Sequence, residues 1–188
     1  MFETDRFIED CRAALNEGDS RGAIRDLVAR AVSTPSHILR ALGEPVRSGV
    51  NTIYRAPDLT ILNLCWGPGM SIHPHDHRMW AVIGVYTGRE DNIFWRRLRD
   101  ADGNRIEAAA AAKSIGERDA EPLGRDIIHS VTNPVNRLTA AIHVYGGDFF
   151  ATPRSEWNPE TLEEHPYDVE HTKRVFEEAN QRLARAAD

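Results

Sequence analysis

Histidines that could bind a transition metal gather at one place in this sequence. The segment His73-Pro74-His75-Asp76-His77 holds three of them, and His129 follows about fifty residues later. Imidazole is the commonest protein ligand for a transition metal near neutral pH. Because residues two apart in a strand point to the same face, His75 and His77 can hold one ion from one strand. We expect His129 to complete the site from another strand.

Other interpretations of these histidines stay open at this point. His73 and His75 are also two residues apart, but Pro74 between them disturbs the strand alternation. We therefore expect His73 at the rim of the site. The alternative for His75 and His77 is an exposed polar loop in which histidines fall together by chance. The alternative for His129 is a surface histidine beside a turn.

The residues that must position these side chains form short strand-like runs from about residue 50 onward. The predicted strands are Asn51–Arg55, Thr60–Trp66, Met79–Tyr86, Asn92–Leu98, Ile106–Ala111, Ile127–Val131 and Thr139–Tyr145. Turn residues separate them, and Asp102-Gly103-Asn104 is typical of a hairpin turn. The run Ala108–Ala112 favours helix locally, but its context predicts a strand or a sheet edge. Many short strands without intervening helices predict a sandwich or barrel.

Both ends of the chain are predicted to be helical. Apolar residues recur at helical spacing within residues 5–32, with an interruption at Gly18-Asp19-Ser20, and Pro35 opens a third, short helix. A loop is predicted for residues 152–166. The apolar stripe of Asp168–Ala187 predicts an amphipathic helix, which packs on the barrel or forms the surface of a homodimer.

Composition narrows the class of protein. The chain of 188 residues is long enough for one domain with a substantial core. Its net charge of -6 argues against a general affinity for nucleic acid. No apolar run is long enough to span a membrane, and the acidic N-terminus does not resemble a secretory signal. The two cysteines, Cys11 and Cys65, argue against a disulfide scaffold, so we expect a cytoplasmic protein.

Two sets of spaced residues resemble the two motifs of the cupin superfamily. The first set is Gly69, His75, His77 and Gly88, and the second is Gly116, Pro122-Leu123-Gly124, His129 and Asn133. The resemblance implies a mainly β, jelly-roll (double-stranded β-helix) barrel over residues 50–150, with His75, His77 and His129 as metal ligands. One cupin domain would then cover residues 1–188, with a helical segment at 1–45 and a C-terminal loop and helix at 151–188.

At two places the sequence departs from the usual cupin pattern. At both it resembles the thiol dioxygenases, the group of cysteine dioxygenase and 3-mercaptopropionate dioxygenase. Cupins usually carry a glutamate ligand shortly after the second histidine, where this chain has Ala81 and Val82. The second motif also has two additional residues before its histidine. The group binds ferrous iron with three histidines, so the resemblance implies Fe(II) as the cofactor, and a small thiol and O2 as substrates.

The same resemblance implies roles for two residues near the end of the last predicted barrel strand. In the group, a serine, a histidine and a tyrosine at alternate strand positions form a relay, with the tyrosine nearest the metal. Here His143 and Tyr145 match, whereas the serine position is Ala141. No cysteine lies near Val82, so the cysteine–tyrosine crosslink of mammalian-type enzymes is not expected. The alternative for His143 and Tyr145 is a core position with satisfied hydrogen bonds.

The three histidines and the two candidate arginines also suit the chemistry of a ferrous thiol dioxygenase. Three neutral imidazoles leave a ferrous ion dicationic, so an anionic thiolate can balance its charge beside O2. A substrate carboxylate needs a cation, and arginine suits it by bidentate pairing. Arg55 lies near the position of the carboxylate-binding arginine of cysteine dioxygenases, and Arg154 lies nine residues after Tyr145, as in the mercaptopropionate enzymes. We favour Arg154; the alternative for each arginine is a surface salt bridge.

These observations predict an iron-dependent thiol dioxygenase that oxidises a small thiol, such as cysteine or 3-mercaptopropionate, to its sulfinate. Ala141 at the serine position motivates an alternative, a metal-dependent cupin dioxygenase or isomerase that acts on a non-thiol substrate. A third hypothesis is a non-catalytic cupin that binds a small ligand.

Overall fold

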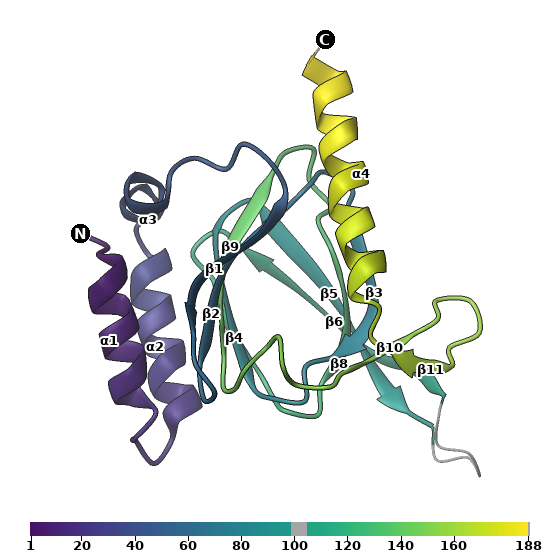
Figure 1. The fold of residues 1–188 in the computed structure, drawn as a ribbon, viewed down its shortest axis with the longest axis horizontal. Helices are drawn as coiled ribbons and strands as arrows, with labels where there is room; N and C mark the ends of the chain where they lie inside the picture. Colours follow the sequence, from purple (N-terminus) through teal and green to yellow (C-terminus); the bar gives the residue numbers. More distant parts are fainter. Residues whose placement is uncertain (99–104, 188) are drawn as a thin grey trace.

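The computed structural model describes residues 1–98 and 105–187, and it has a mainly β fold with helices at both ends (Figure 1). The helices are α1 (Thr4–Ala14), α2 (Ser20–Val32), α3 (Pro35–Leu42) and α4 (Val169–Ala187). The strands are β1 (Gly49–Arg55), β2 (Thr60–Trp66), β3 (Ser71–Asp76), β4 (Ala81–Thr87), β5 (Arg89–Arg97), β6 (Ile106–Gly116), β7 (Ala120–Leu123), β8 (Ile128–Thr132), β9 (Thr139–Tyr145), β10 (Ser155–Trp157) and β11 (Glu164–Pro166). The predicted fold class is confirmed.

The strands form two antiparallel sheets that face each other across the interior of the barrel (Figure 1). One sheet has the order β1-β2-β9-β4-β7, and the other has the order β11-β10-β3-β8-β5-β6. Strands that are distant in the sequence are neighbours in space, since β9 pairs with both β2 and β4, and β8 pairs with both β3 and β5. This topology brings the segment around residue 75 next to the segment around residue 129.

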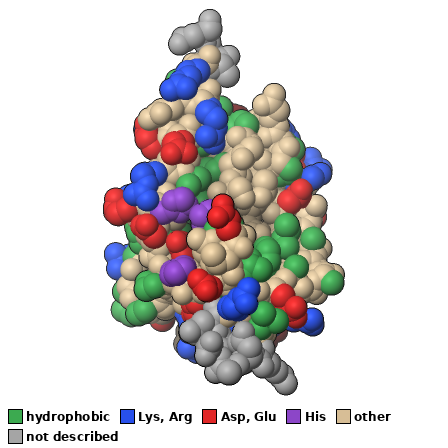
Figure 2. Space-filling view, turned by 90° about the vertical axis from the view of Figure 1, so that its right-hand side faces the viewer, with side chains coloured by type: hydrophobic (Ala, Val, Ile, Leu, Met, Phe, Trp, Pro, Cys, Tyr) green, Lys and Arg blue, Asp and Glu red, His purple; other side chains and the backbone are tan. Residues whose placement is uncertain are grey.

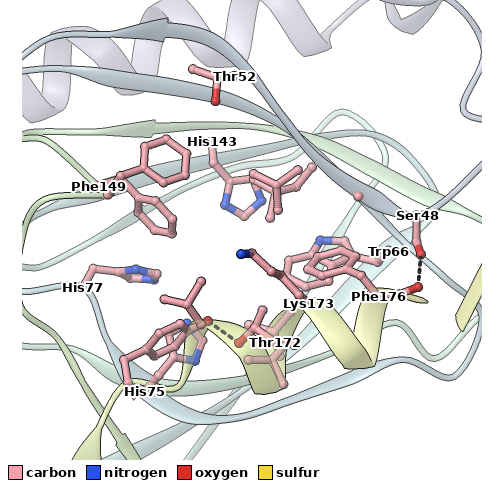
Figure 3. A pocket seen from close by; sticks show the side chains of 18 of the residues that line it. Ser48, Thr52, Trp66, His75, His77, His143, Phe149, Thr172, Lys173 and Phe176 are labelled. Carbon is pink, nitrogen blue, oxygen red and sulfur yellow. Dashed lines mark hydrogen bonds between the residues drawn. The ribbon is translucent and has the colours of Figure 1, made fainter. Parts of the chain in front are cut away.

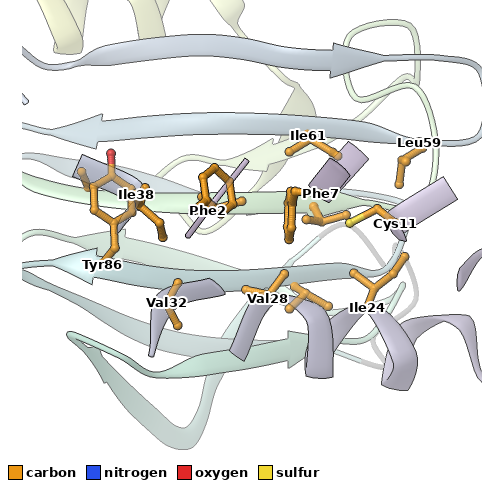
Figure 4. Close-up of a cluster of buried hydrophobic side chains, with 14 of the residues drawn as sticks. Phe2, Phe7, Cys11, Ile24, Val28, Val32, Ile38, Leu59, Ile61 and Tyr86 are labelled. Atoms are coloured by element: carbon orange, nitrogen blue, oxygen red, sulfur yellow. The ribbon is translucent and has the colours of Figure 1, made fainter. Parts of the chain in front are cut away.

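The N-terminal helices, predicted from their apolar spacing, cover the outer face of the five-stranded sheet (Figure 4). Side chains of α2 such as Ile24 and Val28 are fully buried against sheet residues such as Ile61. The helix approaches closely at Gly84, where a Cβ atom would lie 2.3 Å from Val28 Cγ1. The interruption predicted at Gly18-Asp19-Ser20 lies directly before and at the start of α2. There the Asp19 side chain caps the helix by accepting a hydrogen bond from the backbone N–H of Gly22.

Helix α4 lies against the opposite side of the barrel (Figure 1). Its apolar stripe faces the barrel, with Phe176 and Ala179 buried among residues of the inner core. Asn180 fixes the helix to the segment before β1, because its side chain exchanges hydrogen bonds with the backbone N–H and carbonyl of Ser48. Among the helices of the described ranges, none has the length and apolarity that crossing a membrane requires.

The structure corrects the sequence prediction in the segment after Phe150. A loop was predicted for residues 152–166, but the segment contains β10 and β11, which pair with each other. Each strand has only three residues, too few to establish an alternating pattern, and β10 joins the sheet through one pairing of Glu156 with His75. Strand pairing with a distant segment, rather than local preference, decides the structure here.

Other predictions in the barrel had mixed outcomes. The alanine run Ala108–Ala112 lies in β6, so the strand prediction is confirmed there. Strands β3 and β7 were not among the predicted runs. Pro74 lies where the pairing of β3 with β8 changes register between Ile72 and His75, and this irregularity obscures the strand pattern. The predicted hairpin turn at Asp102-Gly103-Asn104 lies outside the described residues.

Candidate metal centre

The three histidines expected as ligands converge inside the barrel. His75, near the end of β3, pairs directly with His129 on β8, and His77 follows just after β3. One ring nitrogen from each of the three lies within 4.8 Å of the others. His77 Nε2 and His129 Nε2 are 2.9 Å apart. His73 lies outside this group, and its ring stacks on that of His171 with the centroids 4.7 Å apart.

Hydrogen bonds fix the tautomers of two of these rings. His75 Nδ1 lies 2.9 Å from the His73 carbonyl oxygen, and His129 Nδ1 lies 2.7 Å from Asn92 Oδ1. Both oxygens are acceptors, so each Nδ1 carries a hydrogen and each neutral ring keeps a lone pair on Nε2. This arrangement is typical of metal-bound histidines, whose second nitrogen donates to a carbonyl. The donor set therefore fits a divalent transition metal.

Burial keeps the three rings in the form that binds metal. All three side chains are buried. Burial lowers the pKa of His75 to about 4, and burial together with the neighbouring histidines lowers the pKa of His77 and of His129 well below the ordinary value. At neutral pH the imidazoles are uncharged, so an ion does not have to displace protons from them.

The histidines open into a cavity of about 540 Å³ between the sheets and α4 (Figure 3). This volume lies within the range of roughly 300–1,000 Å³ typical of ligand sites. Much of the wall is apolar and includes Leu64, Trp66, Ile72, Val131, Phe149 and Phe176. The polar groups of the wall include His143, Tyr145 and Arg154.

His143 and Tyr145 both face this cavity from β9 (Figure 3 labels His143). Tyr145 OH is 3.1 Å from His143 Nδ1, and the Tyr145 ring centroid is 5.1 Å from that of His77. Burial raises the pKa of Tyr145, so its hydroxyl keeps its proton at neutral pH. His143 and Tyr145 therefore lie within hydrogen-bonding distance of each other, with the Tyr145 ring beside His77. Ala141, the third position of the pattern, contributes a buried methyl group.

The structure separates the two candidate arginines. Arg154 lines the cavity, and its guanidinium carbon lies 3.9 Å from the Phe149 ring centroid and 4.4 Å from that of Tyr167. Arg55 is not among the described residues that line the cavity, and its guanidinium forms a bidentate pair with Asp148. For Arg55 the alternative stated above, a surface salt bridge, matches the structure.

Figure 2 shows the face of the molecule that lies on the right-hand side of Figure 1, where both acidic and basic side chains are exposed. Side chains of the two charges are interspersed there, and histidine side chains lie among them. Two basic residues of the cavity rim are paired with acidic ones, Lys173 with Glu170 and Arg47 with Glu177. Arg154 differs from these, because its Nη1 is buried and has no hydrogen-bond partner among the described residues.

Sequence reasoning missed several residues that support the site. Glu90 and Asn92 point inward from β5, and Tyr167 covers Arg154 and His75. The predicted strand began at residue 92, so Glu90 fell outside it. The run Glu90-Asp91-Asn92 is polar throughout and therefore resembles a solvated segment. Only the spacing of two residues between Glu90 and Asn92 indicates that both could share the inner face.

Comparison with known proteins adds little to this geometry. No protein-family model matches the sequence. An uncharacterized conserved protein with a double-stranded β-helix domain from Klebsiella pneumoniae is 10% identical, with 60% of this chain and 81% of that chain covered and a TM-score of 0.45. An RmlC-like cupin family protein from Methanocaldococcus jannaschii is 8% identical, with coverage of 57% and 86% and a TM-score of 0.46.

A structure of oxalate oxidase in complex with the substrate analogue glycolate is also similar. It is 16% identical, covers 55% of this chain and 53% of that chain, and has a TM-score of 0.41. This chain thus spans about half the length of that oxidase. At such identities and TM-scores these likenesses carry no argument about the chemistry of this chain, which has to come from its own residues.

Proposed function

We propose that this protein is an iron-dependent thiol dioxygenase that converts a small, carboxylate-bearing thiol to its sulfinate. The observation that carries the proposal is the three-histidine cluster, which has no carboxylate ligand among the described residues and opens into a cavity lined by a partly buried arginine. In the reaction both oxygen atoms of O2 are added to the substrate sulfur, which is oxidised while O2 is reduced. No further reductant is needed.

Neutral ligands favour the binding of an anionic substrate. His75, His77 and His129 contribute no charge, so a bound divalent ion keeps both positive charges. A ferrous ion held there would supply a binding position for a thiolate beside O2 and the redox chemistry between them. A cysteine or mercaptopropionate thiolate would lower the net charge of the buried site, which favours its binding in a low-dielectric environment.

Arg154 supports a substrate with a carboxylate. Its Nη1 is buried and lacks a partner among the described residues, which costs free energy unless a ligand supplies an acceptor. Stacking between Phe149 and Tyr167 holds the guanidinium in place. A carboxylate that pairs with Arg154 would orient the other end of a short thiol toward the histidines.

The remaining wall residues orient the reactants and exclude water. The Tyr145 ring lies beside that of His77, and the hydrogen bond between its hydroxyl and His143 restricts the orientation of that hydroxyl. Apolar side chains, including Leu64, Val131 and Phe176, surround the reacting groups. A water-poor cavity strengthens each electrostatic contact and limits the loss of partly oxidised sulfur species to solvent.

The test is oxygen consumption by the ferrous, full-length protein with cysteine, 3-mercaptopropionate and cysteamine, with the sulfinate quantified by mass spectrometry. We expect turnover with at least one of the two carboxylate-bearing thiols, at one O2 per sulfinate, and a much lower rate with cysteamine, which has no carboxylate. The proposal is wrong if none of the three thiols supports turnover above that of free ferrous iron.

The size of the cavity favours a second candidate, a metal-dependent cupin dioxygenase or isomerase that acts on a larger, non-thiol substrate. A cavity of about 540 Å³ can hold a ligand well above the size of cysteine. A mass-spectrometric screen of carboxylic acids with the metal-loaded protein separates the candidates. Conversion of a compound without sulfur, together with no oxidation of the three thiols, would favour this second function.

A further inference from the structure

A carboxylate that the proposed chemistry does not use lies next to His143. The Glu90 side chain is 0% exposed, and its Oε1 accepts hydrogen bonds from Trp66 Nε1 at 2.5 Å and His143 Nε2 at 3.1 Å. Its Oε2 has no hydrogen-bond partner among the described residues. Glu90 thus extends the contact between His143 and Tyr145 into a continuous hydrogen-bonded chain across the two sheets.

A carboxylate buried in this way needs a positive partner. Removing an isolated charge from water has a large free-energy cost, so buried carboxylates are paired or take up a proton. Within the described residues, the one basic side chain that contacts Glu90 is His143. Arg89 precedes Glu90 in β5 and Asp91 follows it. Their side chains pair with each other on the exposed face of the strand, so Arg89 does not pair with Glu90. An ionised Glu90 and an uncharged His143 together carry one negative charge. One additional proton on either side chain makes the pair neutral overall.

The position of that proton determines the direction of the Tyr145 hydroxyl. If His143 carries hydrogens on both ring nitrogens, Nδ1 donates to the Tyr145 oxygen, and the tyrosine O–H is free to donate into the cavity. The result is the same if the proton moves to Glu90 and His143 keeps only the hydrogen on Nδ1. If the pair lacks the proton, His143 Nδ1 must accept, and the Tyr145 O–H points away from the cavity.

We propose that Glu90 and His143 jointly hold one proton, and that this proton directs the O–H of Tyr145 toward the substrate side of the cavity. Glu90 is then a positioning residue that acts through His143. It supports the histidine from β5, whereas Ala141 on the same strand as His143 offers no polar group. The use of the donated hydrogen bond on a bound reactant rests on the proposed function, but the placement of the proton does not.

The test is nitrogen-15 NMR of the histidine side chains in the full-length protein loaded with diamagnetic zinc at neutral pH, with His143 assigned by its absence in His143→Gln. We expect His143 Nδ1 to be protonated in the wild-type protein. In Glu90→Gln the neutral amide still accepts from Trp66 and His143 but supplies no charge, so Nδ1 should move to the range of an unprotonated imidazole nitrogen. Asp91→Asn removes the neighbouring carboxylate, which faces outward, and should leave the His143 spectrum unchanged.

The wild-type spectrum alone can overturn the inference, even if Glu90→Gln does not fold, because an unprotonated Nδ1 contradicts it. An unchanged His143 spectrum in a folded Glu90→Gln protein contradicts it as well. With the active ferrous enzyme, loss of this positioning should reduce kcat roughly 10–100-fold with little change in KM, and Asp91→Asn should retain wild-type kcat. If the NMR result holds but no thiol is oxidised, the proposed function fails and the proton placement stands.

Discussion

The two faces of β9 differ in what they bury. Ile142 and Val144 point outward into the apolar cluster covered by the N-terminal helices, whereas His143 and Tyr145 point inward to the cavity. All four side chains are 3% exposed or less, so burial alone does not distinguish them. The difference lies in their partners. The outer side chains contact other apolar groups, and the inner ones are held by hydrogen bonds beside open volume.

This difference indicates a division of labour within one sheet. The outer face gains stability from close packing, which scales with the apolar area removed from water. The inner face leaves a cavity of about 540 Å³ unfilled and buries polar groups whose hydrogen bonds contribute little net stability. Substitutions on the two faces should therefore separate stability from activity.

The largest expected effect is on the inner face of the barrel, at a predicted ligand of the metal. Replacing His129 with alanine removes one of three converging nitrogens, so we expect loss of bound iron and a rate no greater than that of free iron. Elemental analysis and oxygen consumption measure these two losses. His165→Ala changes an exposed histidine outside the cluster and should leave both unchanged. Retention of stoichiometric iron by His129→Ala would contradict the assigned ligand set.

The converse effect is expected on the outer face. Ile142→Ala leaves a hole beneath the helices and should lower the free energy of unfolding by about 2–5 kcal/mol. The folded protein should still bind metal with wild-type stoichiometry. Urea denaturation measures the first result, and elemental analysis measures the second. Leu64→Ala at the cavity wall is the matched inner control, and it should cost less because one side of Leu64 already faces open volume.

The sequence could predict those strands and site residues that show a local pattern of spacing. The run Thr139–Tyr145 predicted a strand, and the resemblance to the thiol dioxygenases implied that His143 and Tyr145 lie at alternate positions of it. The spacing of His75 and His77 placed two candidate ligands together. Which face is inside could not be read from β9 alone, because every residue of the strand is buried. Neighbouring strands and the helices on one side decide it.

Residues whose role depends on long-range pairing could not be predicted. Glu90 reaches His143 because β5 and β9 lie on opposite walls of the barrel, and Asn92 reaches His129 because β5 pairs with β8. Neither contact leaves a local pattern. Arg154 was favoured over Arg55 from spacing, but its position beside Tyr167 depends on how the segment of β10 and β11 folds back.

A smaller effect is expected when the charge of Arg154 in the cavity wall is removed. Arg154→Gln should raise KM for 3-mercaptopropionate roughly 10–100-fold, because a hydrogen bond to a charged group contributes about 1.5–3 kcal/mol. Cysteamine, without a carboxylate, should show little change. Arg55→Gln breaks an exposed ion pair with Asp148 and should leave KM unchanged. A KM increase in Arg55→Gln alone would reverse the assignment of the two arginines.

The smallest effect concerns the two cysteines of the outer cluster. Burial raises the pKa of Cys11 to about 12 and that of Cys65 to about 11, from an ordinary value of 9.0. Above pH 9 the unfolded chain therefore loses these protons before the folded protein does, and the stability of the fold decreases as pH rises toward 11. The expected loss at pH 10 is about 1 kcal/mol per thiol.

Denaturation at pH 8 and pH 10 measures this loss, with the double variant Cys11→Ala/Cys65→Ala as the control. The variant should be less stable at pH 8, because it leaves cavities, but it should lose less stability between the two pH values. An equal loss in both proteins would mean that the thiols ionise as readily in the folded protein as in the unfolded chain.

The central claim is that the inner face adds both atoms of O2 to a thiol at the three-histidine centre. The most direct measurement supplies oxygen-18 gas to the ferrous protein with 3-mercaptopropionate or cysteine and determines the mass of the product. We predict a sulfinate in which both oxygen atoms are labelled, formed by the wild-type protein and not by His129→Ala. A sulfinate with one unlabelled oxygen, disulfide as the sole product, or equal formation by His129→Ala would contradict the account.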